Sequence, residues 1–221
     1  MHSPCDLIFY PTGHVNVEVL ANDLQQPNLE LLICVALAEH LDFGSRGFNE
    51  PICVYPSAVA TFYAPSDRCG TGGMRTERIR AVPSWRKGQG RYDCVFIKDS
   101  SSPTIPNTVR DFNIARVRSF FSSTYRGVLY SFALVHDFTF IGKKSDNETG
   151  MWIVRRPRSP RARVVLLNSI YRAAHLIPVY HAARVPVQKT QTPERCLDDY
   201  EFFYVNKFID HHAFEIAHER A

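Results

Sequence analysis

The sequence predicts an α+β fold, in which a small curved β-sheet or barrel of five to seven short strands is flanked by an N-terminal helix and a C-terminal amphipathic helix. Three observations predict it. Apolar residues recur at helical spacing over residues 28–41, short segments rich in β-branched and aromatic residues follow from residue 51, and a second helical spacing closes the chain. At 221 residues and 45% hydrophobic content, the chain can bury roughly 70% of its unfolded surface.

The first helix is predicted over residues 28–41. Leu29, Ile33 and Leu37 recur at helical spacing, and Pro27 and Asn28 are suitable residues for a helix start. We expect residues 1–50 to form a helical lead-in to the rest of the chain.

Residues 51–185 are expected to form a β-rich accessory domain. Between residues 51 and 64 the pattern leaves short strand and short helix open. The strands beyond it are bounded by Gly, Pro, Ser and Asn, and Gly127 suits a hairpin turn after Tyr125 and Arg126. The predicted strands are 79–85, 91–99, 115–123, 127–138, 151–155, 163–170 and 175–181, with loops at 99–108 and 155–163.

Residues 186–221 are expected to carry the second helix, packed on the β-rich domain. Over residues 196–220 the apolar side chains, including Tyr200, Tyr204, Phe208 and Ile209, fall on one broad arc of a helix. Two aspartates, at 198 and 199, suit its first turn.

The bulk composition indicates an intracellular protein that does not cross a membrane. The longest apolar run, at 31–38, is far shorter than the ~20 residues of a membrane span, and no secretion signal is visible. The six cysteines form no Cys-x-x-Cys pair, which favours reduced thiols. Net charge is +4, yet residues 75–91 and 155–163 together hold 11 of the 26 basic residues and one of the 22 acidic residues. Two basic patches on a mildly acidic body are therefore expected.

The first basic segment is the best candidate for nucleic-acid contact. Guanidinium and ammonium groups neutralise phosphates, and an indole can stack on a base. The alternatives are a solvated edge strand that its arginines protect from aggregation, and a protein-binding surface. The candidate residues are Arg75, Arg78, Arg80, Trp85, Arg86, Lys87 and Arg91.

The second basic segment is expected to be extended and mobile, because prolines at 157 and 160 space its arginines. Such a segment can follow a phosphate backbone or act as a nuclear import sequence, and it can equally be a basic loop without a function. The candidate residues are Arg155, Arg156, Arg158, Arg161 and Arg163.

Two sets of residues are similar in type to enzyme sites. His211, Glu215 and His218 would share one sector of a helix and could hold a metal, although their order differs from the His-Glu-x-x-His of zinc hydrolases. Cys94 could pair with His136 or His175, but no local motif supports it. We expect polar side chains on a structural helix, no metal and no cofactor.

Three phrases of the sequence resemble one family. They are SAVATFYAPSD at 57–67 followed by GGM at 72–74, RYDCVFI at 91–97, and FYVNKFIDHHAFEIA at 203–217. With YRGVLY, ALVH and TGMWIV between them, they are similar to the C-terminal part of fungal Plavaka-type transposases, of the Kyakuja-Dileera-Zisupton group. The resemblance covers about residues 28–217.

The resemblance implies a chain that lies C-terminal to the family's RNase H-like core, whose acidic metal-binding residues carry out DNA strand transfer. No position here matches that core, so no catalytic residue is carried over. We therefore expect a non-catalytic accessory module of a transposase, truncated or fragmentary and nuclear. It would contact DNA through its basic patches, or the missing transposase core or another protein. The alternative is a chromatin- or protein-interaction barrel with an aromatic pocket among Tyr92, Phe120, Phe121, Tyr125 and Trp152.

Overall fold

The computed structural model describes residues 5–7, 13–39, 47–64, 72–98, 108–180 and 195–217. It confirms the α+β class, with several antiparallel sheets and flanking helices. Within these residues there are fifteen strands, more than expected, and no sheet closes into a barrel. The expected loop at 99–108 lies outside the described residues except for Thr108.

The strands form three antiparallel sheets. The first has the order β1 (Cys5–Leu7), β4 (Ser57–Tyr63), β5 (Met74–Val82) and β6 (Arg91–Tyr92). The second has the order β12 (Ala162–Leu166), β9 (Val128–Asp137), β8 (Phe112–Tyr125), β3 (Ile52–Tyr55) and β2 (His14–Val15), and β7 (Cys94–Lys98) joins β8 to β13 (Ile170–Ala174). The third has the order β10 (Thr139–Ile141), β11 (Ile153–Arg155), β15 (Phe202–Val205) and β14 (Leu176–Pro178).

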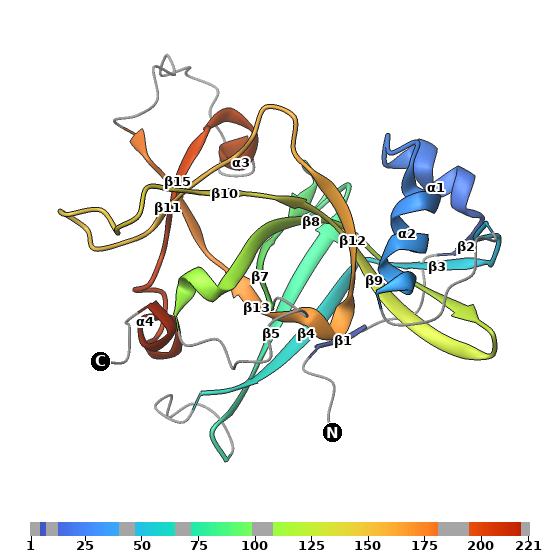
Figure 1. Ribbon diagram of the computed structural model, residues 1–221, viewed down its shortest axis with the longest axis horizontal. Helices are drawn as coiled ribbons and strands as arrows, with labels where there is room; N and C mark the ends of the chain where they lie inside the picture. Colours follow the sequence, from blue (N-terminus) through green and yellow to red (C-terminus); the bar gives the residue numbers. More distant parts are fainter. Residues whose placement is uncertain are drawn as a thin grey trace.

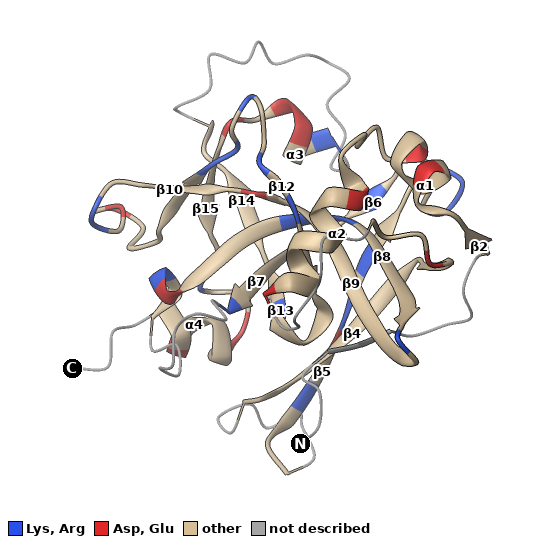
Figure 2. Ribbon diagram, turned by 45° about the vertical axis from the view of Figure 1, so that its right-hand side comes forward, with Lys and Arg blue, Asp and Glu red and all other residues tan. Residues whose placement is uncertain are grey.

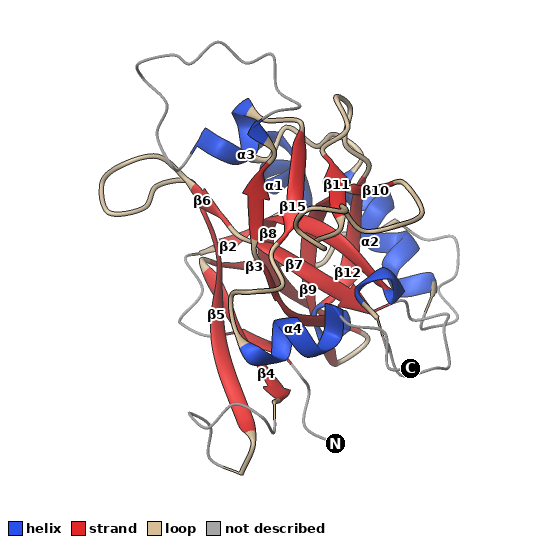
Figure 3. Cartoon of the chain, turned by 90° about the vertical axis from the view of Figure 1, so that its left-hand side faces the viewer, coloured by secondary structure: helices blue, strands red, loops and turns tan. Residues whose placement is uncertain are grey.

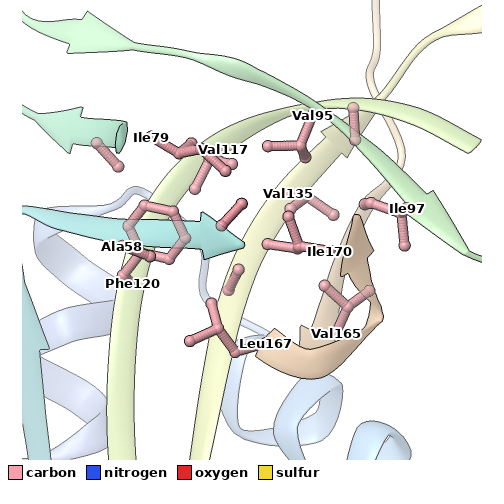
Figure 4. Packing of buried hydrophobic residues seen from close by; sticks show 14 residues of the cluster. Ala58, Ile79, Val95, Ile97, Val117, Phe120, Val135, Val165, Leu167 and Ile170 are labelled. Carbon is pink, nitrogen blue, oxygen red and sulfur yellow. The ribbon is translucent and has the colours of Figure 1, made fainter. Parts of the chain in front are cut away.

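The central core lies between the first two sheets (Figure 4). Ala58 and Ile79 from the first sheet meet Val117, Phe120 and other apolar side chains from the second, all fully buried. Strand β8 has an irregularity in register between Val117 and Ser119. An extra residue in a strand lets residues three apart point to the same side, so Val117 and Phe120 both reach this core.

Two helices and the third sheet cover the opposite face of the second sheet. Helices α1 (Val17–Asp23) and α2 (Leu29–Ala38) bury Leu29, Ile33 and Leu37 against Phe121 and Phe132, which confirms the helix predicted at 28–41. Each such burial contributes roughly 1.5–3 kcal/mol. In Figure 1 these helices lie at one side of the molecule, and β10, β11 and β15 lie at the other.

The hairpin between β8 and β9 follows the predicted turn. Arg126 and Gly127 both have positive φ, +50° and +78°. A two-residue turn with positive φ at both positions matches the right-handed twist of the flanking strands, which explains the glycine.

The C-terminal segment is not one helix, and that prediction is wrong. It contains a short helix α3 (Cys196–Asp199), strand β15, and a helix α4 (His211–Ala217). Phe203 and Val205 are buried in the strand, whereas Phe208 is 61% exposed and Ile209 44% exposed. Residues 202–205 form a strand rather than a helix because their backbone pairs with β11 on one side and with β14 on the other, which completes the third sheet. Tertiary pairing thus overrides the helical spacing.

Candidate nucleic-acid interface

Trp85 stands at the centre of an arginine cluster in the connection between β5 and β6. The guanidinium carbons of Arg80, Arg86 and Arg91 lie 4.7, 5.6 and 5.7 Å from the centroid of its ring. These distances are within the ~6 Å range of cation–π attraction. The structure therefore brings three arginines of the first basic segment together around one aromatic ring.

The turn beside Trp85 presents two basic side chains to solvent. Arg86 and Lys87 are both exposed and both have left-handed backbones, with φ of +51° and +64°. This conformation costs roughly 1–2 kcal/mol for a residue with a Cβ. Two hydrogen bonds close the turn: the Gly88 N–H donates to the Trp85 carbonyl at 2.9 Å, and the Trp85 N–H donates to the Gln89 carbonyl at 3.0 Å. In Figure 3 the connection projects as a loop beside β6.

Asp93 holds the base of the cluster. Its carboxylate accepts a hydrogen bond from the backbone N–H of Arg80 at 2.9 Å and another from Nε of Arg91 at 2.8 Å. The pKa of Arg80 is lowered by burial and by repulsion from Arg91, Arg78 and Arg86, against the opposing attraction of Asp93. Positive charge is therefore in excess around Trp85.

A second aromatic ring with two arginines adjoins this cluster. The guanidinium carbons of Arg118 and Arg116 lie 4.3 and 5.5 Å from the ring centroid of Tyr92. Arg116 is held by the carboxylate of Asp198, with N–O distances of 2.6 and 3.2 Å. Sequence analysis missed both arginines, although their alternation in the predicted strand 115–123 indicated a shared face. Figure 2 shows basic residues in blue on both β5 and β8.

The second basic segment is only partly available for a ligand. Arg156 donates to the carbonyls of Tyr200 and Asp198 at 3.1 and 2.6 Å, and Arg163 pairs with Asp137 at 2.8 Å. These bonds join both side chains to neighbouring elements, so Arg156 and Arg163 are engaged within the protein.

The other three arginines of that segment are exposed. Arg155 lies 3.7 Å from Glu201, and Arg158 and Arg161 lie in the connection between β11 and β12. The first basic segment is also partly engaged: Arg75 lies 3.9 Å from Asp210, away from the Trp85 cluster.

A buried ionic network lies beneath the first basic segment. The side chain of Arg172, on β13, is 1% exposed and pairs with Asp210 at 2.5 and 3.0 Å and with Glu77 at 3.4 Å. Its guanidinium also donates to Nδ1 of His212 at 3.0 Å and lies 4.5 Å from the centroid of the Phe62 ring. Burial opposes the charge on Arg172, but the two carboxylates outweigh it and raise its pKa.

The same network fixes the start of α4. Asp210 accepts a hydrogen bond from the Ala213 N–H at 2.7 Å, as a helix N-cap does. Burial would raise the pKa of Asp210, but the hydrogen bonds from Arg172 and Ala213 lower it to about 2. His212 stacks on Phe62, with ring centroids 4.9 Å apart. The network therefore joins β5, β13 and α4, and sequence analysis did not find it because its members lie far apart in the chain.

The structure describes His211 and Glu215, two of the three residues of the candidate metal site. His211 and Glu215 lie on the exposed side of α4, and His212 between them is the buried histidine. His218 lies outside the described residues. Within the described ranges, no group of three His, Cys, Asp or Glu side chains is placed to hold a metal ion.

The two remaining alternatives are a Cys94 nucleophile and an aromatic pocket. Cys94 and His175 line the same cavity, but burial raises the pKa of the Cys94 thiol to about 12, which leaves it protonated and a poor nucleophile.

The aromatic pocket of a protein-interaction barrel is not assembled. Phe120 is buried in the central core, Phe121 under the helices, and Trp152 beside the third sheet.

We expect the protein to lose stability as pH falls from 7.5 to 5. The pKa of His212 is lowered by burial and by Arg172, and burial also lowers that of His175. Burial, with Arg118 and Arg116, lowers the pKa of His136 to about 4. Below the unfolded value of ~6.5 the unfolded chain then binds more protons than the folded protein, so the free energy of unfolding decreases as pH falls through this window.

Urea unfolding at pH 7.5, 6.5, 5.5 and 5.0 measures this decrease while most carboxylates remain ionised. A His212→Gln variant should show a shallower decrease than the parent. A free energy of unfolding that stays constant or rises between pH 7.5 and 5.0 contradicts the prediction.

Comparisons of the chain with protein-family models, with curated proteins and with solved structures find no match. None of the helices in the described part of the chain is long and apolar enough to span a membrane.

Proposed function

We propose that the chain is a non-catalytic, nucleic-acid-binding accessory module of a Plavaka-type transposase. The observation that carries the nucleic-acid role is the arrangement at Trp85, where three guanidinium groups surround one indole ring on a surface with excess positive charge. Arginines supply phosphate contacts, and an aromatic ring between them offers a face for a base. The transposase context rests on the sequence resemblance alone.

The phrases that carry the resemblance contribute contacts to the buried Arg172 network and to the arginine clusters. Phe62 of the first phrase stacks on His212 of the third. The second phrase supplies Arg91, Tyr92 and Asp93, which belong to the aromatic and arginine clusters. We infer that the module positions nucleic acid for chemistry that a separate catalytic core would perform.

Double-stranded DNA is expected to bind weakly, without sequence preference, and with a steep dependence on salt. Five basic residues (Arg78, Arg80, Arg86, Lys87 and Arg91) making about four phosphate contacts correspond to a log–log salt slope of roughly −3 to −4. Fluorescence anisotropy with a labelled duplex between 50 and 200 mM salt measures the slope. The same DNA incubated with Mg²⁺ should remain uncut.

The triple variant Arg80→Ala/Arg86→Ala/Lys87→Ala should weaken binding and flatten the slope. The matched control is Arg155→Ala/Arg158→Ala/Arg161→Ala, which removes the same charge from exposed positions of the second basic segment. Equal losses in both variants would indicate non-specific attraction by net charge. DNA binding that is unchanged in the first variant would show that the Trp85 cluster does not contact DNA.

A further inference from the structure

A groove leads from the Trp85 cluster into the body of the protein. A cavity of about 540 Å³ opens between β5, the start of β7, the end of β13 and α3. A second hollow of about 290 Å³ lies against Trp85 and Arg116. Arg91, Tyr92, Asp93 and Leu197 line both hollows, so the two hollows adjoin at these residues. The two hollows together are called the groove. The larger hollow is within the roughly 300–1,000 Å³ of small-molecule sites.

The lining of the larger hollow combines two kinds of polar group. Two basic residues, Arg78 and Arg91, line it together with Tyr92. Carboxylates are supplied by Glu77 and Asp93. Each of these carboxylates already accepts hydrogen bonds from the protein, Asp93 from Arg80 and Arg91, and Glu77 from Arg172 and the Ala173 N–H. Carboxylate oxygens each have a second lone pair, so both groups can accept further hydrogen bonds from a ligand.

His175 adds a neutral imidazole to the same hollow. It is exposed to solvent, yet the protein atoms packed around its ring lower its pKa below the ordinary value. At neutral pH it therefore offers one N–H donor and one acceptor nitrogen. The hollow thus presents carboxylate acceptors, the neutral imidazole of His175, the guanidinium donors of Arg78 and Arg91, and an aromatic residue.

We propose that this groove binds single-stranded nucleic acid and receives one unpaired base that carries an exocyclic amino group. The inference rests on the proposed function and names its substrate class. The phosphates would lie on the arginines around Trp85, and the base would enter beside Tyr92. Adenine, cytosine and guanine can donate an amino hydrogen to Asp93 or Glu77, whereas thymine has no amino group to donate.

Two other ligand classes fit the groove less well. A free phosphate or an acidic peptide would place its negative charge against Glu77 and Asp93 inside the cavity, where like charges repel. A base pair within an intact duplex keeps its donors and its faces stacked inside the helix, so it cannot enter the cavity. An unpaired base is uncharged and can donate to these carboxylates, while its phosphates lie on the arginines of the groove.

The test compares 12-nucleotide single strands of dA, dC and dT with a mixed-sequence duplex, using fluorescence anisotropy on the full chain. We expect dA and dC strands to bind at least about fivefold more tightly than the dT strand, as one good base contact would give. Leu197→Trp, which narrows the part shared by both hollows, should weaken the dA strand about tenfold and abolish its advantage over dT. Binding of the duplex should not change.

The matched control is Val128→Trp, which adds the same ring at an exposed position in the β8–β9 hairpin. Thermal unfolding confirms that both variants remain folded, and Cys196→Phe provides a second obstruction of the cavity if Leu197→Trp does not fold. Equal affinities for dA and dT, or dA binding unchanged by the obstructing variant, overturn the inference. In that case the proposed function still stands if Arg80→Ala/Arg86→Ala/Lys87→Ala weakens binding, and it fails if that variant has no effect.

Discussion

Replacing Arg172 with alanine is expected to lower the free energy of unfolding by about 3–5 kcal/mol. Arg172 is the largest fully buried side chain among the described residues, and it pairs with both Asp210 and Glu77. Without it, two carboxylates remain close together in a poorly solvated site, and His212 loses the donor to its Nδ1. Urea-induced unfolding at pH 7.5 measures the change.

The control for this prediction is Arg155→Ala. Arg155 and Glu201 form an ion pair with 47% and 41% exposed side chains, and such surface pairs contribute between 0 and about 1 kcal/mol. The double variant Arg172→Ala/Asp210→Ala should cost less than the sum of the two single changes, because each single change leaves an unpaired charge. Similar small losses for Arg172→Ala and Arg155→Ala would show that the network does not support the fold.

Replacing Phe203 with alanine is expected to destabilise the protein by about 3–5 kcal/mol, whereas Phe208→Ala should cost less than about 1 kcal/mol. Phe203 is fully buried on β15 and meets Phe138 edge to face, with ring centroids 5.8 Å apart. Phe208 is 61% exposed and contacts Lys207 and Phe214 at the surface. Thermal unfolding with urea titration compares the two variants.

These two phenylalanines also distinguish the two possible structures of the C-terminal segment. A single amphipathic helix over residues 196–220 would bury Phe208 on its inward arc. The strand buries Phe203 instead. A larger loss of unfolding free energy for Phe208→Ala than for Phe203→Ala would therefore indicate a single helix in place of strand β15.

Local sequence patterns predicted the elements whose determinants are neighbours in the chain. Helix α2 follows from the spacing of Leu29, Ile33 and Leu37, because side chains three and four residues apart share one face. The turn at Arg126–Gly127 follows from the backbone freedom of glycine. The first basic segment was likewise visible as a run of arginines around Trp85, and the structure places Arg80, Arg86 and Arg91 against that ring.

The remaining features depend on partners that are remote in sequence. Strand β15 has a helical spacing in isolation and becomes a strand because β11 and β14 offer hydrogen bonds on both sides. Arg116 meets Asp198 across 82 residues, and Arg172 meets Glu77 across 95. A linear pattern records which charges are present, but their burial and neutralisation depend on which strands lie side by side.

The sequence alone therefore determined the α+β class, the first helix, the main hairpin and the existence of a basic segment with a tryptophan. The tertiary structure decided which arginines surround Trp85, which are paired with carboxylates, and where a groove opens beside them. The physical reason is sequence separation, because backbone propensity and side-chain periodicity act over only a few residues along the chain. Burial, ion pairing and cavity shape arise only when distant strands pack together.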